Sequence, residues 1–176
     1  MGIASILLLL QLTVPSELLQ ESRRLFFRFE EDKCLSEALF ETIDAANTAN
    51  DPVLLAYKGM ARATSAACSY NPYTKYSRFQ EGRLWIEQAV KAQPNNIEIR
   101  FMRLSVQVNA PHFLGYSGQL TEDRAMILTG LANDPTLLTD AEFTLKLLKF
   151  VAQTAQPLAI ERQQLDALIN QLSHGK

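Results

Sequence analysis

The sequence predicts an all-α fold made of antiparallel helix pairs, with about eight helices in 176 residues. The first observation is a recurring turn, because Asn-Asp-Pro occurs at residues 50–52 and again at residues 133–135. Pro94 lies almost midway, 42 residues after Pro52 and 41 residues before Pro135. A period of about 40 residues is typical of stacked helix pairs. The second observation is that apolar residues recur three or four positions apart between these turns, as they do on one face of a helix.

The first three helices are expected around the first Asn-Asp-Pro turn. We expect one helix over residues 17–30 and a second over residues 34–48. Pro52 should open a third helix that continues to about residue 69, because proline is tolerated in the first turn of a helix. Residues 69–76, which contain three tyrosines, interrupt the apolar pattern and are expected to form an irregular connection.

A central turn separates the expected fourth and fifth helices. Pro94 should end the fourth helix, because proline has no amide donor and restricts the residue before it. Asn95 and Asn96 suit the turn and the cap of the next helix. Apolar or small residues recur at helical spacing on both sides of the turn, namely Phe79, Gly82, Ile86, Ala89 and Val90 before it and Ile97, Phe101, Leu104 and Val108 after it.

The last three helices follow a second irregular segment, residues 109–118. Its apolar side chains are expected to pack between helices, and if they are exposed instead they would mark a partner site. Thr121 should cap the sixth helix, and Thr139 with Glu142 should form a capping box that opens the seventh. Pro157 should start the eighth.

The residues around the central turn resemble one unit of the tetratricopeptide repeat. Residues 82–96, in the pattern Gly-x-x-x-Ile-x-x-Ala-Val-x-x-x-Pro-Asn-Asn, are similar to its second helix and exit turn, and residues 57–59 are similar to its first-helix glycine. The match covers about one repeat. Arg100, Arg103 and Gln107 depart from it, because the pattern expects bulky apolar or small residues there. The resemblance implies a right-handed α-solenoid. Small secreted helical-repeat proteins of unknown function are also similar, and this likeness implies no activity.

Charge is distributed unevenly along the chain, although the net charge is only −2. Residues 17–51 hold nine acidic and four basic side chains, whereas residues 58–103 hold eight basic and three acidic ones. One interpretation is pairing between neighbouring repeats, and the other is an anion-binding patch in the middle of the array. No nucleic-acid binding is expected, because the chain is mildly acidic and carries no recognised module for it.

The N-terminal residues 1–16 have the composition of a signal peptide. Their run of leucine, isoleucine and alanine is too short for a membrane span, which needs about 20 apolar residues. We therefore expect cleavage before Glu17, a single helical-repeat domain over residues 17–176, and a periplasmic or extracellular location. The run contains no lysine or arginine, so a first helix that buries these leucines in a cytoplasmic protein, or a start codon assigned too late, remains the alternative.

Two cysteines, Cys34 and Cys68, lie at equal distances on either side of Asp51. In an antiparallel helix pair, residues equally far from the turn lie at the same level. A disulfide between Cys34 and Cys68 is therefore geometrically feasible and would stabilise the chain by roughly 3–4 kcal/mol. The alternative is two buried free thiols. The absence of a Cys-x-x-Cys pair gives no indication of zinc or thioredoxin chemistry.

We expect a non-catalytic module that binds or scaffolds a protein or peptide and needs no cofactor or metal. Helical arrays offer a concave surface for such partners. The candidate binding residues are Tyr73, Tyr76, Trp85, Arg100, Arg103 and Tyr116.

Structural roles are the alternative for each candidate: the tyrosines could cover helix ends, Trp85 could pack between repeats, and the arginines could pair with Glu87 or Glu98. A self-assembling structural protein is a second possible function. An enzyme is a weaker third, because no catalytic motif is present and His112 has no clustered acid or cysteine.

Overall fold

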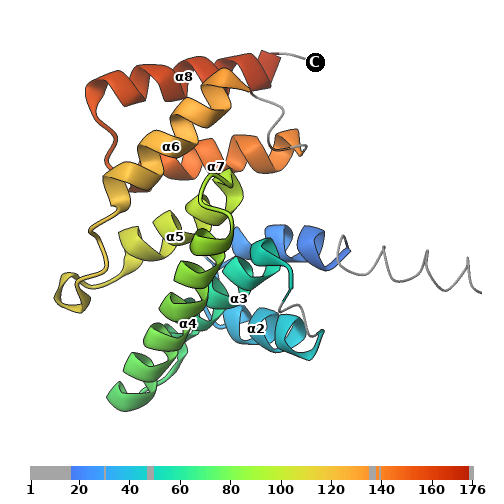
Figure 1. Ribbon diagram of the computed structural model, residues 1–176, viewed down its shortest axis with the longest axis vertical. Coiled ribbons are helices and arrows are strands. Elements are labelled where there is room, and N and C mark those ends of the chain that lie inside the picture. Colours follow the sequence, from blue (N-terminus) through green and yellow to red (C-terminus); the bar gives the residue numbers. More distant parts are fainter. Residues whose placement is uncertain (1–16, 30, 47–49, 135–137, 139, 175–176) are drawn as a thin grey trace, which may run out of the picture. The chain divides into compact units, whose positions relative to one another are not determined.

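The structure is a computed structural model that describes residues 17–29, 31–46, 50–134, 138 and 140–174 (Figure 1). The all-α prediction is confirmed, because the described residues contain helices and connections but no strand. A helical stretch at residues 17–26 comes before seven labelled α-helices. These are α2 (Leu35–Ala45), α3 (Pro52–Ser65), α4 (Pro72–Ala92), α5 (Ile97–Asn109), α6 (Leu120–Asn133), α7 (Ala141–Thr154) and α8 (Ala159–His174).

The chain divides into two compact units, the first ending at Trp85 and the second beginning at Ile86. Helix α4 contributes residues to both units. The expected signal peptide, residues 1–16, lies outside the described residues. None of the described helices has the length and apolar character needed to cross a membrane.

In the first unit, α2 packs against α3, and a disulfide joins the two helices away from the turn. Cys34 lies directly before α2, and Cys68 ends a short 3-10 helix that follows α3. Their Cα atoms are 5.6 Å apart. At the turn itself, Asp51 caps α3, because its Oδ1 accepts hydrogen bonds from the amides of Val53 at 2.9 Å and Leu54 at 3.1 Å.

Ion pairs in the first unit connect the acidic N-terminal region with the basic region that follows it. Lys58 of α3 lies 2.6 Å from a carboxylate oxygen of Asp44. Arg78 of α4 pairs with Glu37 of α2 and also donates to the carbonyl oxygen of Ser65. Within this unit, the uneven charge of the sequence is therefore used for pairing between helices.

Helices α3 and α4 approach closely at two glycines, Gly59 and Gly82. A Cβ atom on Gly82 would lie 2.5 Å from the amide nitrogen of Ala63 and 2.8 Å from its Cβ, and it would also overlap the carbonyl oxygen of Gly59. Real Cβ atoms do not approach other atoms so closely. Only glycine therefore fits at position 82.

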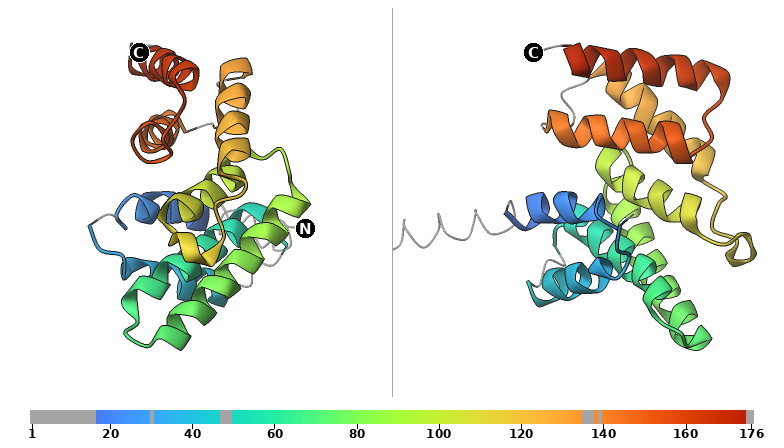
Figure 2. Two further views of the ribbon diagram at one scale, coloured as in Figure 1. Left: turned by 90° about the vertical axis from the view of Figure 1, so that its left-hand side faces the viewer. Right: turned by 180° about the vertical axis from the view of Figure 1, so that it is seen from behind.

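In the second unit, α5 packs against α6, α7 packs against α8, and α6 also contacts α8. Figure 2 shows α7 and α8 lying side by side. Phe101 of α5 is buried, and its ring meets those of Phe143 and Phe150 of α7 edge to face, with centroids 6.2 Å and 5.4 Å apart. Asn96 caps α5 as predicted, because its Oδ1 accepts from the amides of Glu98 and Ile99.

Four helix starts differ from the sequence prediction, those of α4, α6, α7 and α8. Helix α4 begins at Pro72, so Tyr73 and Tyr76 belong to a helix, because Asn71 caps it by accepting from the amides of Tyr73 and Thr74. Thr121 lies inside α6 and does not cap it.

The other differences concern α7 and α8. Asp140 caps α7 by accepting from the amide of Phe143 at 2.9 Å, and Thr139 lies outside the described residues. Helix α8 begins at Ala159, two residues after Pro157. Glu161 fixes this start, because its Oε2 accepts the amide of Leu158 at 2.6 Å.

Replacing Gly82 with alanine should lower the free energy of unfolding by about 1–3 kcal/mol, because the added methyl group overlaps α3. Urea unfolding followed by circular dichroism measures this change. Gly118→Ala is the control, since a Cβ there would meet no atom within 4 Å. At an exposed position inside a helix, replacing glycine with alanine stabilises the protein by up to about 1 kcal/mol. A more stable Gly82→Ala variant would therefore contradict the close approach.

Candidate functional site

Helix α5 places three polar side chains on one face, where a packed helix normally presents apolar residues. Arg100, Arg103 and Gln107 follow one another at spacings of three and four residues, so they point in the same direction. Each is no more than 5% exposed. Buried polar and charged groups require partners, because losing water without a replacement hydrogen bond is costly.

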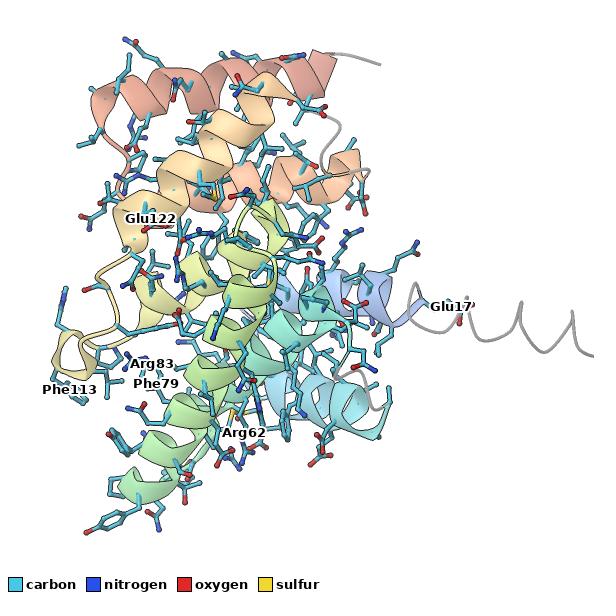
Figure 3. The ribbon with its side chains drawn as sticks, in the orientation of Figure 1. Glu17, Arg62, Phe79, Arg83, Phe113 and Glu122 are labelled. Atoms are coloured by element: carbon cyan, nitrogen blue, oxygen red, sulfur yellow. A yellow bond between two sulfur atoms is a disulfide. The ribbon has the colours of Figure 1, made fainter. Side chains whose placement is uncertain are left out.

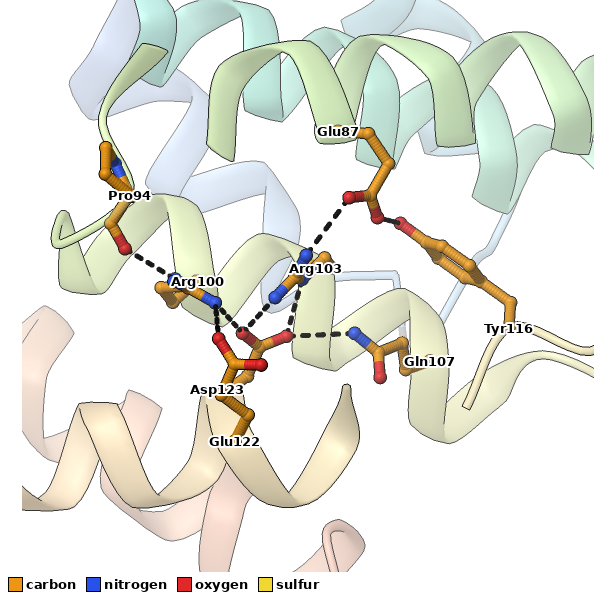
Figure 4. Close-up of polar contacts among 8 residues, drawn as sticks. All are labelled: Glu87, Pro94, Arg100, Arg103, Gln107, Tyr116, Glu122 and Asp123. Carbon is orange, nitrogen blue, oxygen red and sulfur yellow. Dashed lines mark hydrogen bonds and ion pairs between the residues drawn. The ribbon is translucent and has the colours of Figure 1, made fainter. Parts of the chain in front are cut away.

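Asp123, in the first turn of α6, is the common partner of these three side chains (Figure 4). Arg103 forms a two-pronged contact with it, Nε to Oδ2 at 2.7 Å and Nη2 to Oδ1 at 2.7 Å. Arg100 Nη1 donates to Oδ1 at 2.8 Å, and Gln107 Nε2 donates to Oδ2 at 2.9 Å. The Asp123 carboxylate therefore accepts four hydrogen bonds while it is 0% exposed.

Two further carboxylates extend this arrangement at its edges. Glu122, whose side chain is 60% exposed, accepts from Arg100 Nη1 at 2.8 Å. Glu87 of α4 accepts from Arg103 Nη1 at 3.0 Å through one oxygen and from the hydroxyl of Tyr116 at 2.8 Å through the other.

We call the resulting set the Asp123 cluster. Its members are Glu87, Arg100, Arg103, Gln107, Tyr116, Glu122 and Asp123.

Each charged side chain of the Asp123 cluster is paired with one of opposite charge within it. Burial alone would lower the pKa of Arg103, but the hydrogen bonds and negative charges of Asp123 and Glu87 outweigh this effect and raise that pKa above its ordinary value. Arg100 is fixed from a second side, since its Nε donates to the carbonyl oxygen of Pro94 at 2.6 Å. Because its buried ions are all paired, this cluster has the chemistry of a connection between helices rather than of a proton-transfer site.

The Asp123 cluster also fixes the segment that joins α5 to α6. Tyr116 is buried, and its hydroxyl bond to Glu87 attaches this segment to α4. The expectation that all the apolar side chains of this segment pack inward is therefore correct for Tyr116. It is wrong for Phe113, which is 86% exposed and lies on the loop between α5 and α6 (Figure 3).

The six predicted partner-binding residues do not form one exposed surface. Arg100, Arg103 and Tyr116 are buried in the Asp123 cluster, because Asp123 supplies the acid that two buried arginines require. Trp85 is half-buried in the first unit, where its ring stacks on that of Phe40 with centroids 5.8 Å apart.

Tyr73 and Tyr76 are the two candidates that remain exposed, at 85% and 58%. Tyr70, which was not among the candidates, is fully exposed two residues before α4 begins. We call these three residues the tyrosine surface. Tyr73 and Tyr76 are separated by one helical turn, so they lie on the same side of α4.

A small pocket in the first unit has a volume of about 110 Å³. Both of its arginines have acidic partners: Arg78 pairs with Glu37, and Arg62 pairs with Glu81 at 2.7 Å. The hydrogen bond from Arg62 lowers the pKa of Glu81. The pocket is lined by Glu37, Phe40, Glu41, Arg62, Ser65 and Arg78. Among the described residues, no group of three or more metal-ligating side chains comes together.

The sequence contained an indication of the Asp123 cluster that the prediction did not use. Arg100, Arg103 and Gln107 are the positions that depart from the tetratricopeptide pattern, and their spacing places them on one helix face. Charged residues at core positions of a helix require a buried partner of opposite charge, and uncharged polar ones require a hydrogen-bond partner. This requirement points to an acidic residue such as Asp123 as the partner. Only the structure shows that Asp123 is buried, whereas the adjacent Glu122 is exposed.

Comparisons with known proteins found no protein-family model, no curated protein and no solved structure that matches this chain.

Replacing Asp123 with asparagine should lower the free energy of unfolding by about 3–5 kcal/mol, because it leaves two buried guanidinium groups without their shared counter-charge. Glu122→Gln is a matched control, since Glu122 pairs with the same Arg100 but is mostly exposed. It should cost less than about 1 kcal/mol. Thermal and urea unfolding measure both values, and equal losses would show that the burial of Asp123 does not matter.

Proposed function

We propose that this chain is an exported, non-catalytic module that binds a protein or peptide and is built on tetratricopeptide-like helical repeats. The observation that carries the binding proposal is the tyrosine surface. Large aromatic side chains are normally buried, yet Tyr70 and Tyr73 are at least 85% exposed at the start of α4. Tyrosine is enriched in protein interfaces, where its ring supplies apolar area and its hydroxyl a hydrogen bond.

The tyrosine surface lies on a well-supported part of the first unit. The α4 turn that carries Tyr76 also carries Arg78, which connects it to α2 and to the end of α3. The disulfide holds that same end of α3 against the start of α2. A surface that is already ordered loses less conformational entropy on binding, and this favours recognition.

Two features support tetratricopeptide-like repeats. Consecutive helices pack in pairs, α2 with α3, α5 with α6 and α7 with α8. The glycines that the resemblance singled out, Gly59 and Gly82, are the ones that meet where α3 and α4 approach.

Export is supported by the Cys34–Cys68 disulfide, because such bonds persist in oxidising compartments and are rare in the cytoplasm. The apolar composition of residues 1–16 agrees with it.

Protein purified from its native host should have an intact mass that lacks residues 1–16. Its two cysteines should react with an alkylating reagent only after the disulfide has been reduced. Reduction should also lower its stability by roughly 3–4 kcal/mol, because the disulfide closes a long loop in the unfolded chain. A full-length mass with two reactive thiols would contradict export and support a cytoplasmic protein.

A photocrosslinking phenylalanine analogue at position 73 or 76, in the full chain in its native host, should give a discrete adduct with another protein. The same analogue at position 160 is a matched control, because Ile160 is also 62% exposed but lies on α8. The Tyr73→Ser, Tyr76→Ser double variant should then bind the isolated partner at least about tenfold more weakly.

Adducts only between copies of this chain would instead support the self-assembling alternative. No adduct at either tyrosine position, with the protein folded, would remove the tyrosine surface as a binding site.

A further inference from the structure

We propose that Phe113 is a second docking element, whose ring inserts into an apolar pocket of a partner protein. This inference rests on the proposed function, that the chain binds proteins, and adds a second element to it that is independent of the tyrosine surface. The element is the Phe113 turn, residues 111–115.

The Phe113 turn has a compact and defined backbone. His112–Leu114 form one turn of 3-10 helix, closed by the amide of Leu114 donating to the carbonyl of Pro111 at 3.0 Å. The amide of Gly115 donates to the carbonyl of His112 at 3.1 Å. Gly115 then reverses the chain with a φ of 62°, a conformation that glycine adopts without strain. The turn presents Phe113 outward, with 86% of its surface exposed.

Hydrogen bonds hold the chain on both sides of the Phe113 turn. On the α5 side, Nδ2 of the exposed Asn109 donates to the carbonyl of Ser105 within the same helix at 2.8 Å. On the α6 side, the Tyr116 hydroxyl binds Glu87, and Asp123 binds Arg103 in the first turn of the helix. The position of the turn is therefore fixed before any partner arrives, which reduces the entropic cost of binding.

The chemistry of the Phe113 turn favours a protein pocket over a lipid surface. Residues 109–121 contain no lysine, arginine, aspartate or glutamate. Binding to an anionic membrane is normally supported by basic residues, at about 1 kcal/mol each. The arginines on α5, Arg100 and Arg103, are buried in the Asp123 cluster, and the next charged side chain along the chain, Glu122, is acidic and exposed.

A single aromatic ring on an uncharged turn matches the usual form of an interface anchor. Such anchors fill a dry pocket and supply most of the binding energy of the interface, and one aromatic side chain buries about 150–250 Å². The described pocket in the first unit does not suit this ring, because charged side chains predominate in its lining. This pocket of a second copy would therefore not accept the ring.

The first test places a photocrosslinking phenylalanine analogue at position 113 of the full chain in its native host, with position 117 as the control, since Ser117 is exposed on the same loop. We expect a protein adduct from position 113 only. The crosslinked peptide of that partner should belong to a pocket that is lined by apolar side chains. A lipid adduct, an adduct between two copies of this chain, or no adduct would overturn the proposal.

The second test measures the affinity of the captured protein by calorimetry. Phe113→Ala should weaken binding at least about 30-fold, as for an interface anchor, and Phe113→Leu should recover part of the loss. Leu158→Ala is the control, because Leu158 is also 60% exposed but lies outside the Phe113 turn. Equal affinities for Phe113→Ala and the unchanged chain would overturn the proposal even if the adduct forms.

The contribution of the buried contacts is tested separately with Tyr116→Phe, which removes only the hydroxyl that binds Glu87. In this variant, the amide hydrogens of Leu114 and Gly115 should exchange with solvent faster. The variant should also bind the partner about 3- to 10-fold more weakly. Adducts from the tyrosine surface with none from position 113 would reject this inference alone, whereas their absence at both places would reject the proposed function as well.

Discussion

The completely buried carboxylate of Asp123 is the interaction on which the arrangement of α5 and α6 depends. It pairs with both Arg100 and Arg103, and each of these arginines contacts a further segment: Arg100 donates to the carbonyl of Pro94, and Arg103 donates to Glu87. A buried ion pair is not strongly stabilising compared with an apolar core, but removing one partner leaves a charge without compensation. The cluster therefore specifies which helix faces meet more than it adds to total stability.

The first unit is held together in a different way, with its charged contacts nearer the surface. Its ion pairs, such as Lys58 with Asp44, involve carboxylates that are about half exposed, so each contributes little. Stability there depends on the disulfide and on the close approach at Gly82. The Lys58 ammonium also lies 4.4 Å from the ring centre of Trp85 and forms a cation–π contact with it. The Trp85 ring therefore has two contacts, this one and the stacked ring of Phe40.

The all-α fold, the turn at Pro94 and the Asn96 cap could be predicted from the sequence, because each is determined by residues close together in the chain. The prediction places the start of α4 too late, because the segment with three tyrosines interrupts the apolar pattern, although Asn71 and Pro72 form a local helix start. The sequence names Glu87 as a possible partner of the arginines, and Arg103 does pair with it. Its buried partner, Asp123, could not be identified from the sequence, since both Asp123 and Glu122 suit a first helical turn. Which of them is buried depends on how α6 packs on α5, and that is not a local property.

The residues that depart from the tetratricopeptide pattern explain more of this structure than the residues that agree with it. Apolar residues would be enough to pack this face of α5, whereas Arg103 and Gln107 carry a cost of burial that their hydrogen-bond partners offset. In this structure their common partner, Asp123, lies where the loop after α5 returns to α6, and Arg103 leads through Glu87 to Tyr116 in that loop. The polar residues that depart from this pattern are therefore the ones that fix the loop carrying an exposed phenylalanine. An apolar core would hold the helices equally well, but it would leave the Tyr116 hydroxyl and Glu87 without the charged partner that connects this loop to α5.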